Sequence, residues 1–299
     1  MKTSNQDKTY GVLRYVKDAV TLTKPRITLL SVGTAAAGMS VSDTSFFRSP
    51  HAWLSLLGVG LLVASSSVLN MHAERVFDGL MPRTRNRPLP SGRFRPEIAL
   101  ALGWGLAVFA VVVLAIAANG MTLGLGASAL LLYVFAYTPL KRKSSSALFV
   151  GALAGAMPPL LGTTAVTGSL DSMGLALFMI LFVWQIPHFV AISLLHGAQY
   201  RRAGFVVFSE VFGTVVSKWA VTLSALLLWL ASLVPWWLGG AGFFYALCAC
   251  VTGSWFTVVC ATGFKFEDTG LARWARRVFR ASLLVPLLLF GGLGVGAVC

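Results

Sequence analysis

Three oxygen-bearing side chains, Asn70, Glu74 and Asp78, recur every four residues at the end of an apolar run. In an α-helix a step of four residues turns about 40° beyond a full circle and rises about 6 Å, so the three side chains share one face. Amide and carboxylate oxygens suit Mg²⁺, which takes few protein carboxylates and completes its shell with substrate phosphates. We predict that the three residues bind a metal and act in catalysis. The alternative is a polar helix end, in which Glu74 pairs with Arg75 or with an arginine of the loop that follows.

An arginine-rich loop follows, with the sequence RTRNRPLPSGR at 83–93. Its two prolines and its glycine prevent a continuing helix, so the arginines lie on a shaped turn. Guanidinium groups donate hydrogen bonds in a fork that matches phosphate oxygens. We predict that Arg83 and Arg87 bind a diphosphate. The alternative is a loop whose arginines only set the orientation of the chain in a membrane.

Two further basic segments can reach the same anion. The segment TKPR, at 23–26, precedes the first apolar run, and YTPLKRKSSS, at 137–146, joins two later runs. From them we predict Arg26, Lys141 and Lys143 as additional diphosphate ligands. Each segment taken alone is also typical of an ordinary basic loop.

The elements that must position these residues follow from the composition. The chain is 57% hydrophobic and 11% charged, with a mean hydropathy of +0.78, whereas soluble proteins carry about 25% charged residues. Apolar runs long enough to cross a bilayer recur throughout, and in lipid they must be helices because open strands leave backbone groups unpaired. No long polar segment separates them, so we predict one all-α transmembrane domain over 1–299, with a cytoplasmic tail at 1–24. The nine expected spans are 27–43, 52–70, 97–118, 121–139, 147–166, 173–196, 214–235, 240–264 and 281–298.

The basic residues lie on one side of these predicted spans. The net charge is +14, and with nine spans every lysine and arginine except Arg48 falls on the same side. Lysine and arginine accumulate on the cytoplasmic side of membrane proteins. We therefore expect an integral, multi-pass protein of a bacterial inner membrane or its equivalent, with a cytoplasmic N-terminus and a site that faces the cytoplasm. The charge indicates membrane orientation and anion binding rather than a nucleic-acid partner.

The polar motifs resemble those of a known family. The pattern NxxxExxxD followed by RTRxRPLPxGR resembles the first signature of the intramembrane prenyltransferases related to ubiquinone-biosynthesis enzymes. Four later segments resemble the protohaem IX farnesyltransferase (haem O synthase) branch, in the same order along the chain. They are GAMPPLLG at 155–162, WQIPHF at 184–189, YRRAG at 200–204 and WARRVFRASL at 274–283.

The resemblance implies a fold and a reaction. The fold would be a bundle of nine helices around a central cavity, capped by cytoplasmic loops. The reaction would transfer the farnesyl group of farnesyl diphosphate to a vinyl group of protohaem IX (haem B), with Mg²⁺ as cofactor, and give haem O and diphosphate. The lipid bilayer and haem A synthase or terminal oxidase assembly are the implied partners. The alternatives are a prenyltransferase for a quinone precursor, another aromatic compound or chlorophyllide, and a non-catalytic haem-handling membrane protein.

Aromatic side chains and histidines are candidates for the haem or prenyl cavity. Aromatic faces stabilise an allylic cation, and Tyr133, Tyr137 and Trp184 are candidates by their location. A histidine at membrane depth is a candidate functional residue. His188 could ligate the haem iron, orient the porphyrin or accept a proton in catalysis, or it could hydrogen-bond beside a proline kink. His196 could share the same cavity or be a polar residue at the membrane interface.

One residue departs from the family pattern. The haem branch usually has an aspartate directly before the tyrosine of YRxAG, and Gln199 stands there in this chain. A glutamine can offer a carbonyl oxygen to a metal but no charge, so Gln199 is the fourth candidate metal ligand. Three outcomes remain open: a second metal bound more weakly, a single metal that suffices, or impaired activity.

Overall fold

The computed structural model describes residues 3–266 and 268–296, and this part of the chain contains helices, turns and loops but no strand. The all-α prediction is therefore confirmed. The helices are α1 (Thr3–Leu22), α2 (Pro25–Ser42), η1 (Thr44–Arg48), α3 (Pro50–Gly79), α4 (Pro96–Ala117), α5 (Gly120–Leu131), η2 (Leu132–Tyr137), α6 (Thr138–Leu140), α7 (Ala147–Gly155), α8 (Met157–Thr167), α9 (Ser172–Arg202), α10 (Phe208–Trp237), α11 (Phe243–Ala261), η3 (Thr262–Lys265) and α12 (Asp268–Gly296).

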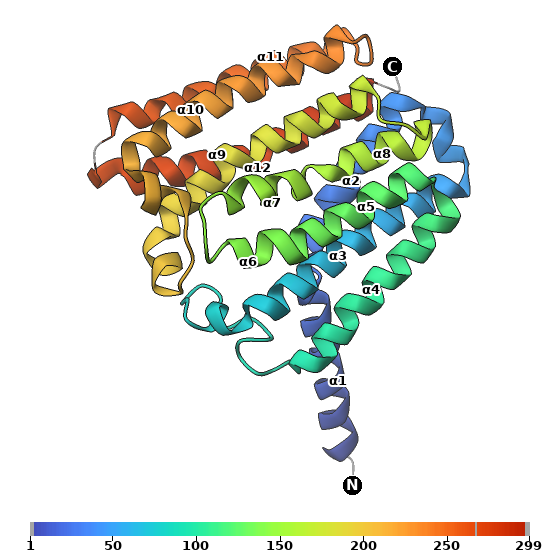
Figure 1. The fold of residues 1–299 in the computed structure, drawn as a ribbon, viewed down its shortest axis with the longest axis vertical. Helices are drawn as coiled ribbons and strands as arrows, with labels where there is room; N and C mark the ends of the chain where they lie inside the picture. The colour runs from blue at the N-terminus through green and yellow to red at the C-terminus, as the bar shows by residue number, and fades with distance from the viewer. Residues whose placement is uncertain (1–2, 267, 297–299) are drawn as a thin grey trace.

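The long helices lie side by side along one common direction (Figure 1). Eight segments of the described chain are long and apolar enough to cross a membrane: α3, α4, α5 through α6, α7 with α8, α9, α10, α11 with η3, and α12. The remaining predicted span, 27–43, corresponds to α2, which packs against α3, α8 and α12. Since α12 contacts both α2 and α9, the end of the chain returns to its first span. The polytopic bundle is confirmed.

Glycines allow the central helices to approach closely. A Cβ atom on Gly38 of α2 would collide with the carbonyl group of Pro159 in α8, and one on Gly162 of α8 would collide with the backbone of Ala35 in α2. Contacts this close maximise van der Waals packing, which is what holds helices together in lipid. The α2–α8 pair is thus a fixed support within the bundle.

Two predicted spans are interrupted. The fifth breaks at Ala156, between α7 and α8, and Pro158 and Pro159 lie in the first turn of α8, where proline is tolerated. The fourth contains η2, a π-helical segment, and π-helical turns occur most often at functional sites. A π-helical turn holds one residue more than an α-helical turn. This extra residue changes the direction in which the side chains before Lys141 project.

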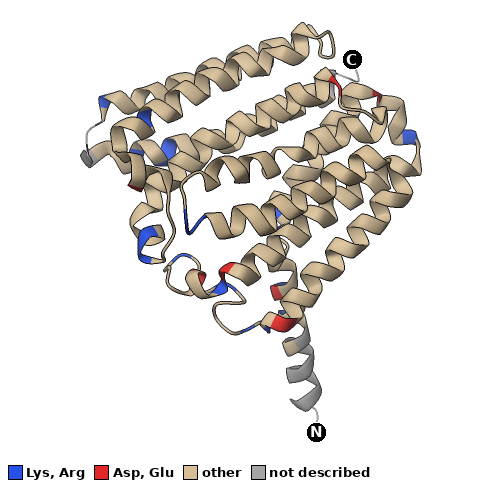
Figure 2. Cartoon of the chain, viewed as in Figure 1, with Lys and Arg blue, Asp and Glu red and all other residues tan. Residues whose placement is uncertain are grey.

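Charged residues gather at one end of the bundle, which we call the basic end (Figure 2). Loops 80–95, 141–146 and 203–207 lie there, at the ends of α3, α6 and α9. The opposite end carries η1, with Arg48 and Asp43, and Asp171 at the start of α9. The one-sided placement expected from the sequence is therefore seen in the fold.

The segment predicted as a tail contains helix α1, which extends below the bundle in Figure 1. Its last turns pack on the polypeptide that leaves the arginine-rich loop. The Tyr15 ring stacks on Phe94 at 4.4 Å between centroids, and Leu22 is fully buried in the same cluster. The end of this helix is thus part of the folded bundle.

Candidate active site

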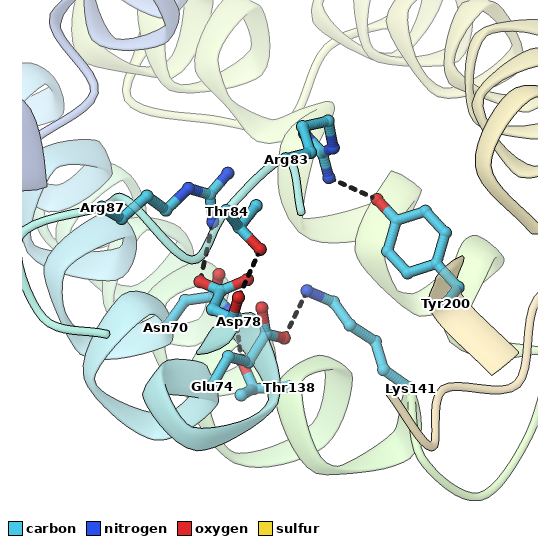
Figure 3. A network of polar contacts seen from close by, with 9 residues as sticks. All are labelled: Asn70, Glu74, Asp78, Arg83, Thr84, Arg87, Thr138, Lys141 and Tyr200. Atoms are coloured by element: carbon cyan, nitrogen blue, oxygen red, sulfur yellow. Dashed lines mark hydrogen bonds and ion pairs between the residues drawn. The ribbon is translucent and has the colours of Figure 1, made fainter. Parts of the chain in front are cut away.

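One face of α3 carries the three predicted oxygen donors. Because α3 continues without a break to Gly79, Asn70, Glu74 and Asp78 lie on successive turns of one helix and project into the same polar cluster (Figure 3). Their exposed fractions are 3%, 9% and 2%. Two carboxylates buried this deeply need compensating charge.

Cations from two loops supply that charge. The Nζ atom of Lys141 lies 2.6 Å from Oε1 of Glu74, and NH1 of Arg87 lies 2.8 Å from Oδ2 of Asp78. Glu74 therefore pairs across the bundle with Lys141, whereas Arg75 donates to the backbone carbonyl of His72. The helix-end alternative, in which Glu74 pairs with Arg75, is not what the structure contains.

The same face fits a hard metal ion such as Mg²⁺. Asn70 uses its amide Nδ2 to donate to Thr138 Oγ1 at 3.1 Å, so its carbonyl oxygen remains as a ligand. Glu74 Oε2 and Asp78 Oδ1 accept no hydrogen bond from the described residues. In the described part of the chain, no three His, Cys, Asp or Glu side chains are grouped to hold a metal by themselves. Mg²⁺ would complete its shell with Asn70, water and substrate phosphate, which is its preferred mode of binding.

The arginine-rich loop is held over this face. Thr84 Oγ1 donates to the backbone carbonyl of Asp78 at 2.7 Å, and Arg83 donates from NH2 to the Tyr200 hydroxyl at 3.0 Å. The loop thus connects the end of α3 with the end of α9 (Figure 3). Sequence reasoning did not select Thr84, Thr138 or Tyr200, although Tyr200 belongs to the quoted motif YRRAG.

Lys24 is a further cation of the site that sequence reasoning missed. It is the one non-glycine residue with a positive φ among the described residues, at 48°, and left-handed backbone at such a residue stores strain. Burial and the nearby charges of Lys141 and Arg87 lower the pKa of Lys24 to about 8, against the opposing effect of Glu74 and Asp78. Lys24 therefore shares the electrostatic environment of both ion pairs.

Two predicted cations lie outside this cluster. Arg26 and Lys143 are both exposed, and among the described residues neither takes part in an ion pair. Lys143 stands in the turn after α6. The structure therefore brings Lys24 rather than Arg26 to the acidic face.

Lys141 also borders an apolar cavity of about 150 Å³. Its Nζ lies 4.3 Å from the centroid of the Tyr137 ring, and Tyr137 lies 4.9 Å from Tyr133, centroid to centroid. Burial opposes the charge on Lys141, but Tyr137 and Glu74 favour it more strongly, and the pKa of Lys141 lies above its ordinary value. The cavity also contacts Ser145, Ala147, Leu148, Phe189, Ile192, Ser193, Tyr200, Phe205, Val206, Val207 and Phe208.

Trp184 and His188 occupy the interface between α9 and α12. Trp184 Nε1 donates to the Ser282 carbonyl at 2.6 Å, and the rings of Trp184 and His188 stack at 4.9 Å. The Ser282 hydroxyl donates to the Phe279 carbonyl, so His188 Nδ1, at 2.8 Å from Ser282 Oγ, is the donor in that contact. This tautomer leaves the Nε2 lone pair available as a ligand. The His188 hydrogen bond is thus to α12 and not to the kink beside Pro187.

His196 and Gln199 lie on a separate, more polar cavity of about 320 Å³ between α9, α10 and α12. Gln199 Oε1 is buried and has no hydrogen-bond partner among the described residues. Glu210 lines the same cavity and pairs with Arg201. No contact of the described residues joins Gln199 to Asn70, Glu74 or Asp78, so the structure does not gather the four candidate metal ligands into one cluster.

Two bacterial proteins named protoheme IX farnesyltransferase align with nearly the whole chain. The chain is 43% identical over 278 residues to the protoheme IX farnesyltransferase of Anaeromyxobacter dehalogenans, with 93% of each chain covered. It is 42% identical over 281 residues to the protein of the same name from Myxococcus xanthus, covering 94% of this chain and 95% of the relative.

Solved structures share the fold at lower identity. The apo structure of a UbiA homolog from Aeropyrum pernix superposes with a TM-score of 0.73 at 19% identity, covering 90% of this chain and 97% of that one. A UbiA homolog from Archaeoglobus fulgidus bound to DMAPP and Mg²⁺ superposes with a TM-score of 0.71 at 16% identity, covering 93% and 99%. Residues 31–297 match the UbiA prenyltransferase family. The chain therefore belongs to the UbiA prenyltransferase family.

Proposed function

We propose that the protein transfers the farnesyl group of farnesyl diphosphate to a vinyl group of protohaem IX, giving haem O and diphosphate. The observation that carries this proposal is the acidic face of α3 with its cations, Glu74 paired with Lys141 and Asp78 with Arg87. Membership of the prenyltransferase family supports the donor, and the relatives named protoheme IX farnesyltransferase support the acceptor.

The difficult step is the departure of diphosphate. As the allylic C–O bond breaks, negative charge grows on the leaving oxygens, and fixed cations stabilise that charge. Lys141 and Arg87 pair with the acidic face, Lys24 shares its electrostatic environment, and Arg83 is held above it by Tyr200. Mg²⁺ bound to Asn70, Glu74 and Asp78 would supply additional positive charge at the same oxygens.

When the diphosphate binds, Lys141 and Arg87 change their partners. Without substrate, Lys141 and Arg87 compensate the buried carboxylates of Glu74 and Asp78. With the diphosphate bound, the two cations turn to phosphate oxygens, and the carboxylates become available to the metal. The site thereby keeps its charges balanced in both states.

The acceptor reacts with the allylic carbon. A vinyl carbon of the haem forms the new C–C bond, a cation is left beside the macrocycle, and water adds there as the hydroxyl group and loses a proton. Tyr133 and Tyr137 offer aromatic faces near the diphosphate. Trp184 stacks on His188, whose Nε2 is the nitrogen suited to ligate the haem iron. His196 lies further along α9 and borders the polar cavity.

We further propose a bacterial inner membrane as the location, with the basic end and the N-terminus in the cytoplasm. The positive-inside distribution of lysine and arginine supports this orientation. Haem A synthase or terminal oxidase assembly are the partners that would receive the product.

A reconstitution assay tests the proposed acceptor. Purified protein in lipid vesicles receives farnesyl diphosphate, Mg²⁺ and, in parallel reactions, haem B, a quinone precursor or chlorophyllide. We expect prenylated product from haem B alone. Transfer to another acceptor in preference to haem B would favour a different prenyltransferase, and haem binding without any transfer would favour a haem-handling protein.

A further inference from the structure

An ion pair between an exposed arginine, Arg93, and a buried carboxylate, Asp18, attaches α1 to the exit of the arginine-rich loop. Arg93 Nε lies 3.2 Å from Oδ2 of Asp18, and Arg93 NH2 lies 3.4 Å from Oδ1. The contact is two-pronged, which orients the guanidinium in the plane of the carboxylate. Asp18 is only 8% exposed, so its carboxylate depends on Arg93 for compensation.

The same arginine also closes the loop on itself. Its NH2 group donates to the backbone carbonyl of Asn86 at 3.1 Å. Asn86 directly precedes Arg87, whose side chain binds Asp78 and whose backbone N–H donates to Thr84. Two short contacts therefore lead from Asp18 to a cation of the candidate site.

Apolar packing reinforces this attachment. Phe94, which follows Arg93, is 1% exposed and stacks on Tyr15 of α1. Leu89 of the loop and Leu22 of α1 belong to the same buried cluster. The loop is thus fixed at its start by Thr84 on the end of α3, and at its exit by α1.

We propose that Asp18 is a positioning residue for the reaction: through Arg93 it holds loop 83–93 in the shape that presents Arg83 and Arg87 to the diphosphate. The inference rests on the proposed function only in taking a prenyl diphosphate as the ligand. It gives α1 a part in substrate binding, although no hydrogen bond or ion pair of the described residues joins α1 to Asn70, Glu74 or Asp78. A carboxylate among diphosphate-binding arginines would otherwise oppose an anionic substrate, and here Arg93 neutralises it.

The test measures binding of farnesyl thiodiphosphate, an unreactive probe, with Mg²⁺ to the full-length protein in detergent. Asp18→Asn should weaken binding about tenfold, because a misplaced loop loses the aligned contacts that orient a bound group. Asp18→Glu should stay within about twofold of the unchanged protein. The matched control is Glu97→Gln, which removes the exposed ion pair of Arg95 and Glu97 close to the same loop and should leave binding unchanged.

A second variant covers the case in which Asp18→Asn does not fold. Arg93→Lys keeps the positive charge but cannot contact Asp18 in two places and the Asn86 carbonyl together, so it should also weaken probe binding. Unchanged affinity in folded Asp18→Asn or in Arg93→Lys would overturn the positioning role, as would an equal loss in Glu97→Gln. No probe binding by the unchanged protein would contradict the proposed function instead.

Discussion

The Nζ atom of Lys141 lies 2.6 Å from Oε1 of Glu74, so a cation expected to bind the diphosphate is held by a carboxylate expected to bind the metal. The same relation recurs between Arg87 and Asp78. On the proposed function, metal and diphosphate would replace these two contacts together, because either ligand alone would leave buried charge uncompensated. We expect Mg²⁺ and the diphosphate to bind with positive coupling, each raising the affinity for the other.

Substitution of either partner tests this first pair. Lys141→Gln and Glu74→Gln each leave one charge without its partner, and we expect each to lower the stability of the protein by about 1–3 kcal/mol, below the cost of a fully buried pair because both side chains are partly exposed. The double variant should be no less stable than either single one, while all three lose farnesyl transfer. Thermal unfolding in detergent measures the stability, and additive losses in the double variant would contradict the pairing.

A single substitution at Lys24 should affect stability and activity in opposite ways. Lys24→Gly removes the strain of a left-handed backbone and should stabilise the protein by about 1 kcal/mol, while the lost cation should raise KM for farnesyl diphosphate. Arg26→Ala, two residues away on an exposed side chain, is the matched control and should change neither quantity. A Lys24→Gly variant with unchanged KM would remove Lys24 from the site.

The contact of His188 with Ser282 can be tested through the acceptor. Ser282→Ala removes the oxygen that fixes the ring and its tautomer, so KM for haem B should rise while KM for farnesyl diphosphate stays constant. Ser254→Ala, an exposed hydroxyl on α11 that bonds only to its own helix, should affect neither. Equal changes in both KM values for Ser282→Ala would indicate a general structural role.

Glycine-to-alanine substitutions should change stability in opposite directions at a packed position between α2 and α8 and at an open position on α4. Gly162→Ala places a Cβ against the backbone of Ala35 and should destabilise by about 1–3 kcal/mol. Gly105→Ala, on α4 where a Cβ meets no other atom within 4 Å, should stabilise by about 0.5–1 kcal/mol. Midpoints of thermal unfolding that moved in the same direction would contradict the described contact.

The acidic face could be predicted from sequence because it depends on one helix. The four-residue spacing of Asn70, Glu74 and Asp78 determines a shared side once α3 forms. The break between α7 and α8 is likewise local, since it falls just before Pro158 and Pro159 in the sequence. Contacts of this kind need no knowledge of the other helices.

The remaining parts of the site depend on tertiary packing. Nothing in the segment TKPR says whether Lys24 or Arg26 turns inward, because the left-handed backbone at Lys24 is maintained by the surrounding bundle. The contact of Asp18 with Arg93 joins residues 75 positions apart, and no local pattern in the sequence predicts it. Gln199 lies on a cavity with Glu210, which only the α9–α10 packing reveals.

The most direct test of the account is the coupling of two products in one reconstituted reaction. The protein with haem B, farnesyl diphosphate and Mg²⁺ should release diphosphate in equal amount to haem that has gained one farnesyl and one hydroxyl group by mass. Folded Asp78→Ala should lose both products together, by about 10²-fold or more. Haem of unchanged mass with the unaltered protein, or both products at the original rate with Asp78→Ala, would contradict farnesyl transfer at this face of α3.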